Sequence, residues 1–257
     1  MPETNHVLGK GELHFVPFVT GTNTKTGEQY FGNTPSFGIT VEAQKVDHFN
    51  SDRGLNEKDL TVTISVNRSG SFVTDNIIAD TLAKMFLGSA AVLSQASETA
   101  TMESITVLQD RTYQVGASDA LPSGKRSVTI TSVTSVGGAT VHVLDTDYTV
   151  DAELGRVFII EGGGIADGTE VEITYDVAAH SRKQTISGTE SIYGALRFIA
   201  YNNAGEQTDY YMPKVSLMPN GEFSLKGDDF QQISFTVDIL KDGNKPAVLA
   251  DGRAFIA

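Results

Sequence analysis

Five histidines are the residues whose type best suits metal binding or acid–base chemistry, and their spacing favours neither. They are spread along the chain at His6, His14, His48, His142 and His180. No two of them stand at the spacing of a zinc site, and the HExxH pattern of metalloproteases is absent. The chain has no cysteine, which excludes a thiolate metal site and a disulfide framework. We therefore predict no metal, no cofactor and no catalytic centre, and surface or packing roles for the histidines.

Serines and glycines are numerous, but their spacing does not match a nucleophile or a phosphate site. The GxSxG pattern of serine hydrolases and the GxxxxGK[ST] phosphate loop are both absent. The triple glycine Gly162–Gly164 is not followed by a helical pattern, so it predicts a turn rather than a cradle for phosphate. A glycoside hydrolase would need two carboxylates across a cleft, and no motif in the chain points to such a pair.

Three carboxylates, Asp145, Asp147 and Asp151, gather in one short stretch, and calcium binds such oxygen-rich loops. The stretch lacks the central glycine and the closing bidentate glutamate of the helix–loop–helix calcium site. It therefore predicts a solvated turn between strands, with calcium binding as the weaker alternative.

The polar residues with the clearest arrangement lie on three expected strands, where they alternate with apolar residues. These strands include Phe37–Gln44, Leu60–Asn67 and Gln232–Ile239. Strict alternation buries one face of a strand and leaves the other in water. The wet faces carry hydroxyls, amides and a few carboxylates but no cation: Thr40, Glu42, Gln44, Thr61, Thr63, Ser65, Asn67, Gln232, Ser234, Thr236 and Asp238. Such a surface suits a wall past which a polyanion slides without sticking.

Two further elements are expected beside these strands. Asp47–Lys58 is predicted to be a long charged loop, which is either simply solvated or a docking loop whose ion-pair pattern fixes the register of a partner. Thr74–Leu87 is predicted to be an amphipathic helix that covers a sheet, with Thr74 as its N-cap and Gly88 just after its end.

Length and charge pattern predict a mainly β protein with one inserted part. The 257 residues are enough for one large β domain with an insert. Short strand patterns separated by turn signals fill the later middle of the chain, and residues 105–180 hold eleven acids against four bases, a net charge of −7. We predict a core domain of residues 1–104 and 183–257 and an inserted β subdomain of residues 105–182.

The overall charge, the apolar runs and the first residues of the chain limit which partners and which cellular location we expect. A net charge of −13 and a pI near 4.7 argue against ordinary nucleic-acid binding, which needs cations to neutralise phosphates. The apolar runs are shorter than a membrane helix requires. Met1–Lys10 lacks the basic and apolar regions of a signal peptide, which predicts a protein made and folded in the cytoplasm.

Two separated segments of the chain resemble the major tail protein, or tail tube protein, of long-tailed bacteriophages. They are Gly32–Ile78 and Tyr210–Leu240, and they match in the right order. The resemblance leaves residues 105–180 outside its core. It implies two packed antiparallel sheets flanked by one helix, six copies in a ring, and rings stacked into a hollow tube that guides DNA during ejection.

The same resemblance implies roles for the residues singled out above. The polar faces of the three strands would line the bore, their apolar faces would pack on the second sheet and the helix, and the insert would decorate the tube exterior. The expected partners are further copies of the chain, tail tip and tail terminator proteins, the tape measure protein in the lumen, and DNA that passes without specific binding. The protein would belong to the virion and be made in the host cytoplasm. The inter-ring loop would comprise Asp47, His48, Phe49, Asn50, Asp52, Arg53, Leu55 and Glu57.

Arg197 is the exception on these polar faces. Its strand parity puts it on the bore side with Tyr193 and Tyr201, unless a bulge or an ion pair with Glu42 or Asp238 redirects it. A different function, an immunoglobulin-like surface adhesin or glycan-binding module, would suit the insert alone. The missing leader and the interrupted core domain weigh against that alternative.

Overall fold

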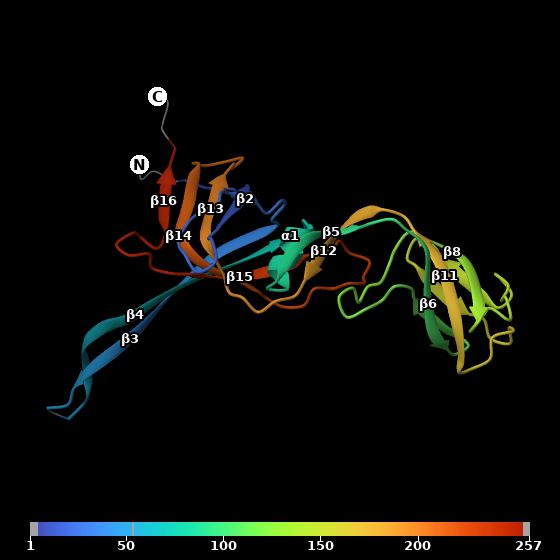
Figure 1. Cartoon of the computed structure of the whole chain (residues 1–257). Helices are drawn as coiled ribbons and strands as arrows, with labels where there is room; N and C mark the ends of the chain where they lie inside the picture. The colour runs from blue at the N-terminus through green and yellow to red at the C-terminus, as the bar shows by residue number, and fades with distance from the viewer. Residues whose placement is uncertain (1–4, 53, 254–257) are drawn as a thin grey trace. The chain divides into compact units, whose positions relative to one another are not determined.

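The computed structural model describes residues 5–52 and 54–253, and the chain divides into two compact units (Figure 1). The first unit combines Met1–Ala91 with Thr185–Ala257, and the second is Val92–Gln184. The predicted mainly β fold, with several antiparallel sheets and one helix, is confirmed in the described residues. The second unit begins earlier than the predicted residue 105, because β6 (Glu98–Val107) pairs with β11 (Thr169–Val177) inside it.

The first unit contains a single eight-stranded antiparallel sheet. Its strand order is β2-β1-β13-β14-β15-β4-β3. β16 pairs with residues 208–211 of β14, which β15 does not reach. β3 and β4 are much longer than the others and form a hairpin that extends away from the rest of the sheet (Figure 1). The strands are β1 (Gly11–Pro17), β2 (Gln29–Tyr30), β3 (Ser36–Asn50), β4 (Glu57–Thr74), β13 (Ile192–Ala200), β14 (Thr208–Pro219), β15 (Ile233–Ile239) and β16 (Leu249–Gly252).

Aromatic contacts show that this sheet curls around its own core. Phe37 on the edge strand β3 lies 5.8 Å, centroid to centroid, from Phe198 on β13, although three strands separate them in the sheet order. Phe72 on β4 lies 4.7 Å from Phe31 and 5.2 Å from Phe235. One face of the sheet is therefore buried against itself, as the alternating pattern of β15 predicts.

The predicted helix Thr74–Leu87 is wrong in its extent. α1 spans only Ala79–Met85, and Ile78 occupies the N-cap without a side-chain cap. Thr74 is instead the buried last residue of β4, where its hydroxyl donates to the carbonyl of Phe31 at 2.9 Å. Strand pairing and burial outweigh the capping preference at this position. The helix still packs on the core, through side chains such as Leu82 and Met85.

The second unit has a separate core between two three-stranded sheets. One sheet has the order β6-β11-β8 and the other the order β7-β10-β9. Twelve buried side chains, from Val107 to Val177, form its core. Residues 139–143 form no strand, and Val141 makes only an isolated bridge with Thr134. The remaining strands are β7 (Arg111–Gln114), β8 (Val128–Ser135), β9 (Tyr148–Asp151) and β10 (Arg156–Ile159).

The chain passes between the units through two strands that pair with each other. They are β5 (Ser89–Gln95) and β12 (His180–Ile186). The side-chain amide of Gln95, on β5, joins two other segments of the second unit. Its nitrogen donates to the carbonyls of Arg126 and Ala178 at 2.6 and 3.0 Å, and its oxygen accepts from the Arg126 amide at 3.1 Å.

Candidate functional site

Small polar side chains from three strands form continuous rows on the uncovered face of the eight-stranded sheet. Residues opposite each other in an antiparallel ladder share a face. Asp238 on β15 is opposite Ser69 on β4, which is opposite Thr40 on β3. Thr236 is likewise opposite Ser71, which is opposite Gly38, and Ser234 is opposite Val73. We call this surface the polar face, and the structure thus brings Thr40, Thr236 and Asp238 together as predicted.

The polar face continues outward along the hairpin, but only as far as a β-bulge. Glu42 pairs with Asn67, and Gln44 pairs with Ser65, whose hydroxyl donates to the Gln44 side-chain oxygen at 3.2 Å. The register then shifts so that Lys45 pairs with Thr63, which leaves Ile64 unpaired. Gln232 precedes β15 and is exposed.

The bulge corrects the prediction that Thr61, Thr63, Ser65 and Asn67 share one face. Gln44 and Lys45 are neighbours on β3, so their side chains point to opposite faces. Ser65 lies with Gln44 and Thr63 lies with Lys45, so these two β4 residues are also on opposite faces. Beyond the bulge the polar face is replaced by Val46 and Val62, while Thr61 and Thr63 lie on the other side.

Residues 40–67 form an arm that is exposed on both faces. Every described residue in this range is exposed, and we call the range the arm. The prediction that its apolar side chains pack on the sheet and helix of the same subunit is wrong; only Phe37 and Ile39, at its base, reach the core. The exposed fractions run from 45% to 61% for Val41, Val46, Leu60, Val62, Ile64 and Val66. Contiguous exposed apolar surface of this kind marks an interaction site in a folded protein.

Asp47–Lys58 is not the long loop that we predicted. β3 continues to Asn50 and β4 begins at Glu57, which leaves residues 51–56 as the connection. Of the residues expected in the loop, Asp47, His48, Phe49, Asn50 and Glu57 lie in the strands, and Asp52 and Leu55 lie in the connection. Arg53 lies outside the described residues.

Polar contacts across the arm explain why the strands extend so far. The Asp47 carboxylate accepts from the Lys58 ammonium and from the Thr61 hydroxyl, both at 2.8 Å. The Lys58 hydrogen bond, followed by that of Thr61, holds the pKa of Asp47 below its usual value. His48 Nδ1 lies 2.5 Å from Asp59 Oδ1. The charges of this segment therefore stabilise cross-strand pairing rather than solvating a loop.

Arg197 does lie on the polar side of the sheet, and a residue outside the prediction neutralises it. Its Nε donates to Glu28 Oε1 at 2.8 Å, rather than to Glu42 or Asp238. Its guanidinium also lies 4.7 Å from the ring centroid of Tyr211. Lys25 contacts the same ring, with Nζ 5.0 Å from the centroid and a hydrogen bond to the tyrosine hydroxyl. Glu28 precedes β2, and no sequence pattern marks it as a partner of Arg197.

A groove of about 960 Å³ opens at the end of the sheet where β1 finishes and β13 begins. It is lined by residues 17–23, 87–89 and 187–193, with Lys214 from β14, and we call it the β1–β13 groove. Gly88 makes the close approach of two of these segments possible, because a Cβ there would lie 1.7 Å from the carbonyl oxygen of Ile186.

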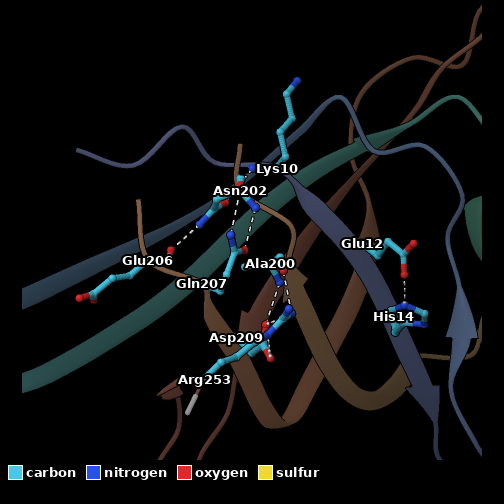
Figure 2. Close-up of polar contacts among 9 residues, drawn as sticks. All are labelled: Lys10, Glu12, His14, Ala200, Asn202, Glu206, Gln207, Asp209 and Arg253. Carbon is cyan, nitrogen blue, oxygen red and sulfur yellow. Dashed lines mark hydrogen bonds and ion pairs between the residues drawn. The ribbon is translucent and has the colours of Figure 1, made fainter. Parts of the chain in front are cut away.

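The turn between β13 and β14 ties the end of the described chain to its beginning (Figure 2). Asp209 accepts from the Ala200 amide at 2.8 Å and from Arg253 Nη2 at 2.9 Å. Arg253 Nη2 also donates to the Ala200 carbonyl at 2.7 Å. Asn202 accepts from the Lys10 amide at 3.0 Å, in the same cluster. The Arg253 hydrogen bond is the main cause that lowers the pKa of Asp209.

The Asp145–Asp151 stretch does not present three carboxylates to one ion, because the Asp147 carboxylate binds backbone amides instead. Asp147 is buried, and its carboxylate accepts from the amides of Val143 and Gly164 at 2.7 and 2.6 Å. These backbone hydrogen bonds, that of Val143 first, lower its pKa. Within residues 5–52 and 54–253, no three His, Asp or Glu side chains are grouped to hold a metal.

The second unit also holds a partly buried acid, Glu103, and a buried phenol, Tyr175. Burial raises the pKa of Glu103, although its carboxylate accepts from the Gly116 amide at 3.0 Å. Burial, with Glu103 next, raises the pKa of Tyr175 to about 12. Nearby, the Lys125 ammonium lies 2.5 Å from the Glu98 carboxylate. The Glu98–Lys125 ion pair and the Glu103–Gly116 hydrogen bond both join segments within the second unit, which suits a structural role.

Comparisons with known proteins place the chain in a family without assigning it a role. In the part of the chain that the structure describes, no helix has the length and apolar character needed to cross a membrane. The curated proteins include no sequence that matches the chain. The family described as "Protein of unknown function UCP028589" matches residues 6–253, which is nearly the whole chain. The chain therefore belongs to the UCP028589 family.

Proposed function

We propose that this protein is a structural subunit of a bacteriophage tail, which assembles into stacked six-membered rings that form the tail tube. The tube would be a smooth conduit for DNA during ejection, and the role would be structural rather than catalytic. The proposal starts from the resemblance of Gly32–Ile78 and Tyr210–Leu240 to tail tube proteins. The observation that carries it furthest is the arm.

The arm supports assembly because it is a long hairpin that its own subunit does not cover. Both of its faces carry exposed apolar side chains, which in water would favour association. The bulge at Ile64 puts Val41 and Val66 on one face and Val46 and Val62 on the other. One arm can therefore bury apolar surface against two different neighbours. A contact with the next ring is the role we propose for its tip, residues 51–56.

The edge of the sheet supports ring formation. β3 pairs with β4 along its length, and its other edge has no partner among the described strands. A free edge of this length is a template for pairing with another chain, and closure of a sheet across subunits removes it. Six such subunits would form one continuous sheet around a bore.

The polar face is the surface that we propose lines the bore. Its side chains are Thr40, Glu42, Gln44, Ser65, Asn67, Ser69, Ser71, Ser234, Thr236 and Asp238. Thr61 and Thr63 are left out of the lining, because the bulge turns them to the other face. Carboxylates repel phosphate and the neutral side chains offer it no cation, so DNA and, before ejection, a tape measure protein would occupy the bore without specific binding. Tail tip and terminator proteins would cap the tube.

Electron microscopy of the concentrated full-length protein tests the proposal directly. We expect rings about one subunit thick that stack into tubes, with sedimentation velocity showing species far larger than the monomer. A protein that remains strictly monomeric at high concentration, with no rings or tubes in micrographs, would contradict the proposal.

A second candidate rests on the second unit, which has its own core between two sheets. An immunoglobulin-like adhesin or glycan-binding module would have such a unit. A glycan array probed with the full-length protein distinguishes the two: specific binding by a monomer favours the adhesin, and ring assembly without glycan binding favours the tail tube.

A further inference from the structure

The loop between β14 and β15 presents a large apolar side chain to solvent. We call residues 220–232 the Phe230 loop, because Phe230 is 93% exposed in it. The loop is ordered by its own contacts: the side-chain Nε2 of Gln231 donates to the Ser224 carbonyl at 3.0 Å, and Phe223 packs against the core of the first unit. An exposed aromatic side chain on an already ordered loop is typical of a residue that anchors an interface, because the loop loses little conformational entropy on binding.

The Phe230 loop is also acidic. It contains Glu222, Asp228 and Asp229 against the single base Lys226, and the two aspartates directly precede Phe230. Each copy of the chain carries a net charge of −13, so two copies repel unless an acidic surface of one meets a basic surface of the other. The partner surface for this loop should therefore combine an apolar hollow with cations.

The β1–β13 groove has that combination. Phe18, Leu87 and Ile192 lie among its lining residues, and Lys214 lines it from β14. Lys214 also acts on the Asp242 carboxylate: the hydrogen bond of Lys245, at 2.5 Å, is the main cause that lowers the pKa of Asp242, and the charges of Lys214 and Lys25 lower it further. Glu190 is the acidic residue of the lining, so the groove is basic towards Lys214 and acidic towards Glu190.

We propose that the Phe230 loop of one copy docks into the β1–β13 groove of a second copy, with Phe230 in the hollow and the adjacent aspartates towards Lys214. This inference rests on the proposed function, for which it names one contact between neighbouring subunits. The two surfaces are different parts of the chain, so the contact is heterologous. Repetition of such a contact produces a closed ring or an open filament rather than a two-fold dimer.

Sedimentation velocity over a concentration series of the full-length protein tests the contact. We expect Phe230→Ser to raise the concentration at which assemblies form by about tenfold or more, since aromatic anchors dominate interface energetics. Leu108→Ser, which changes an exposed apolar residue of the second unit, is the matched control and should assemble like the wild type. Lys214→Glu and the double substitution Asp228→Lys/Asp229→Lys should each weaken assembly by a similar factor.

Mixing provides the decisive measurement. The Lys214→Glu protein and the Asp228→Lys/Asp229→Lys protein should assemble together although each assembles poorly alone, and one chain with all three changes should recover. Wild-type rings that Phe230→Ser leaves unchanged, or charge variants that fail to complement, would overturn this contact and leave the tail-tube proposal intact. A wild-type protein that never assembles would overturn both.

Discussion

Ser65 and Thr63 lie on opposite faces of the arm, although a single residue separates them in the sequence. Ser65 is opposite Gln44, Thr63 is opposite Lys45, and Ile64 between them has no partner in the ladder. An uninterrupted strand would place both side chains on the same face. The bulge therefore confines the polar face to the part of the arm nearest the core, and beyond the bulge the same side of the arm carries the apolar residues Val46 and Val62.

Ile64→Ser should impair assembly without affecting the stability of the subunit. Ile64 is 56% exposed, so the free energy of unfolding should change by no more than about 0.5 kcal/mol. Assembly should require about tenfold more protein, because the substitution removes apolar surface that a neighbour covers. Chemical denaturation and sedimentation velocity measure the two quantities separately.

Val237→Ser is the contrasting control for that prediction, because Val237 is fully buried in the core of the first unit. It should destabilise the subunit by about 2–4 kcal/mol. If Ile64→Ser destabilised the subunit as much, the arm would have to pack against its own subunit in solution.

Replacement of residues 51–56 by a two-residue Asn-Gly turn should leave the subunit folded and prevent stacking. The Asp47–Lys58 ion pair and the Thr61 hydrogen bond lie outside the deleted segment, so the hairpin retains its cross-strand contacts. Circular dichroism should show an unchanged β spectrum, and electron microscopy should show single rings. Full-length tubes from this variant would refute the role proposed for the tip.

Thr236→Lys should permit ring assembly and hinder the passage of DNA. Thr236 lies in the middle of the polar face, opposite Ser71, and each ring would acquire one cation per subunit that binds phosphate. We expect at least about a tenfold loss of infectivity, which higher salt during ejection in vitro should partly relieve. Thr129→Lys, an exposed change in the second unit, is the control. Normal infectivity of Thr236→Lys would remove this residue from the bore.

Gly88→Ala should destabilise the first unit by about 1–3 kcal/mol. Its Cβ would lie 1.7 Å from the Ile186 carbonyl oxygen and 2.9 Å from the Gly188 nitrogen, and backbone atoms cannot move aside as a flexible side chain can. Gly38→Ala is the matched control, since a Cβ there meets nothing within 4 Å. Urea denaturation of the two variants should differ clearly; equal midpoints would mean that the segments lining the groove are not held together.

Asp209→Asn should lower the free energy of unfolding by about 1 kcal/mol near neutral pH. The substitution weakens the charge-assisted contact between the partly exposed Asp209 and Arg253 side chains (Figure 2). The folded protein lowers the pKa of Asp209, so its contribution is present above the unfolded pKa near 4 and is lost as the pH falls through the folded value. The difference between variant and wild type should therefore shrink below about pH 4. A difference that stays constant down to pH 2 would show that ionisation of Asp209 is irrelevant.

The strands of the first unit were largely predictable from local pattern. Every second residue from Ile192 to Ala200 is apolar or glycine and this segment forms β13, and the alternation of Ile233–Ile239 forms β15 with its apolar side chains buried. The prediction succeeds here because side chains alternate between the two faces of a strand, so apolar residues at every second position indicate the face that packs on the core. The same rule assigned Thr40, Thr236 and Asp238 to one face, and their ladder positions agree.

Local pattern failed where a non-local partner set the outcome. Thr74 is a good N-cap residue, yet pairing with Ile233 on β15 keeps it in β4. The charged segment from Asp47 to Lys58 reads as a loop, yet Lys58 and Thr61 satisfy Asp47 across the hairpin. The sequence does place Phe230 directly after two aspartates, but only the structure shows that Phe230 is exposed whereas Phe223 in the same loop packs against the core.

The sequence by itself determined the class of the fold, the positions of most strands and the small polar character of their wet faces, because each depends on neighbours along the chain. Only the tertiary structure decided that a bulge at Ile64 places Thr63 and Ser65 on opposite faces of the arm. It also decided that Glu28, rather than Glu42 or Asp238, forms the ion pair with Arg197. Finally, it showed that the apolar side chains of the arm are not covered by their own subunit. Those outcomes depend on ladder register and on contacts between segments far apart in the chain, which no local periodicity specifies.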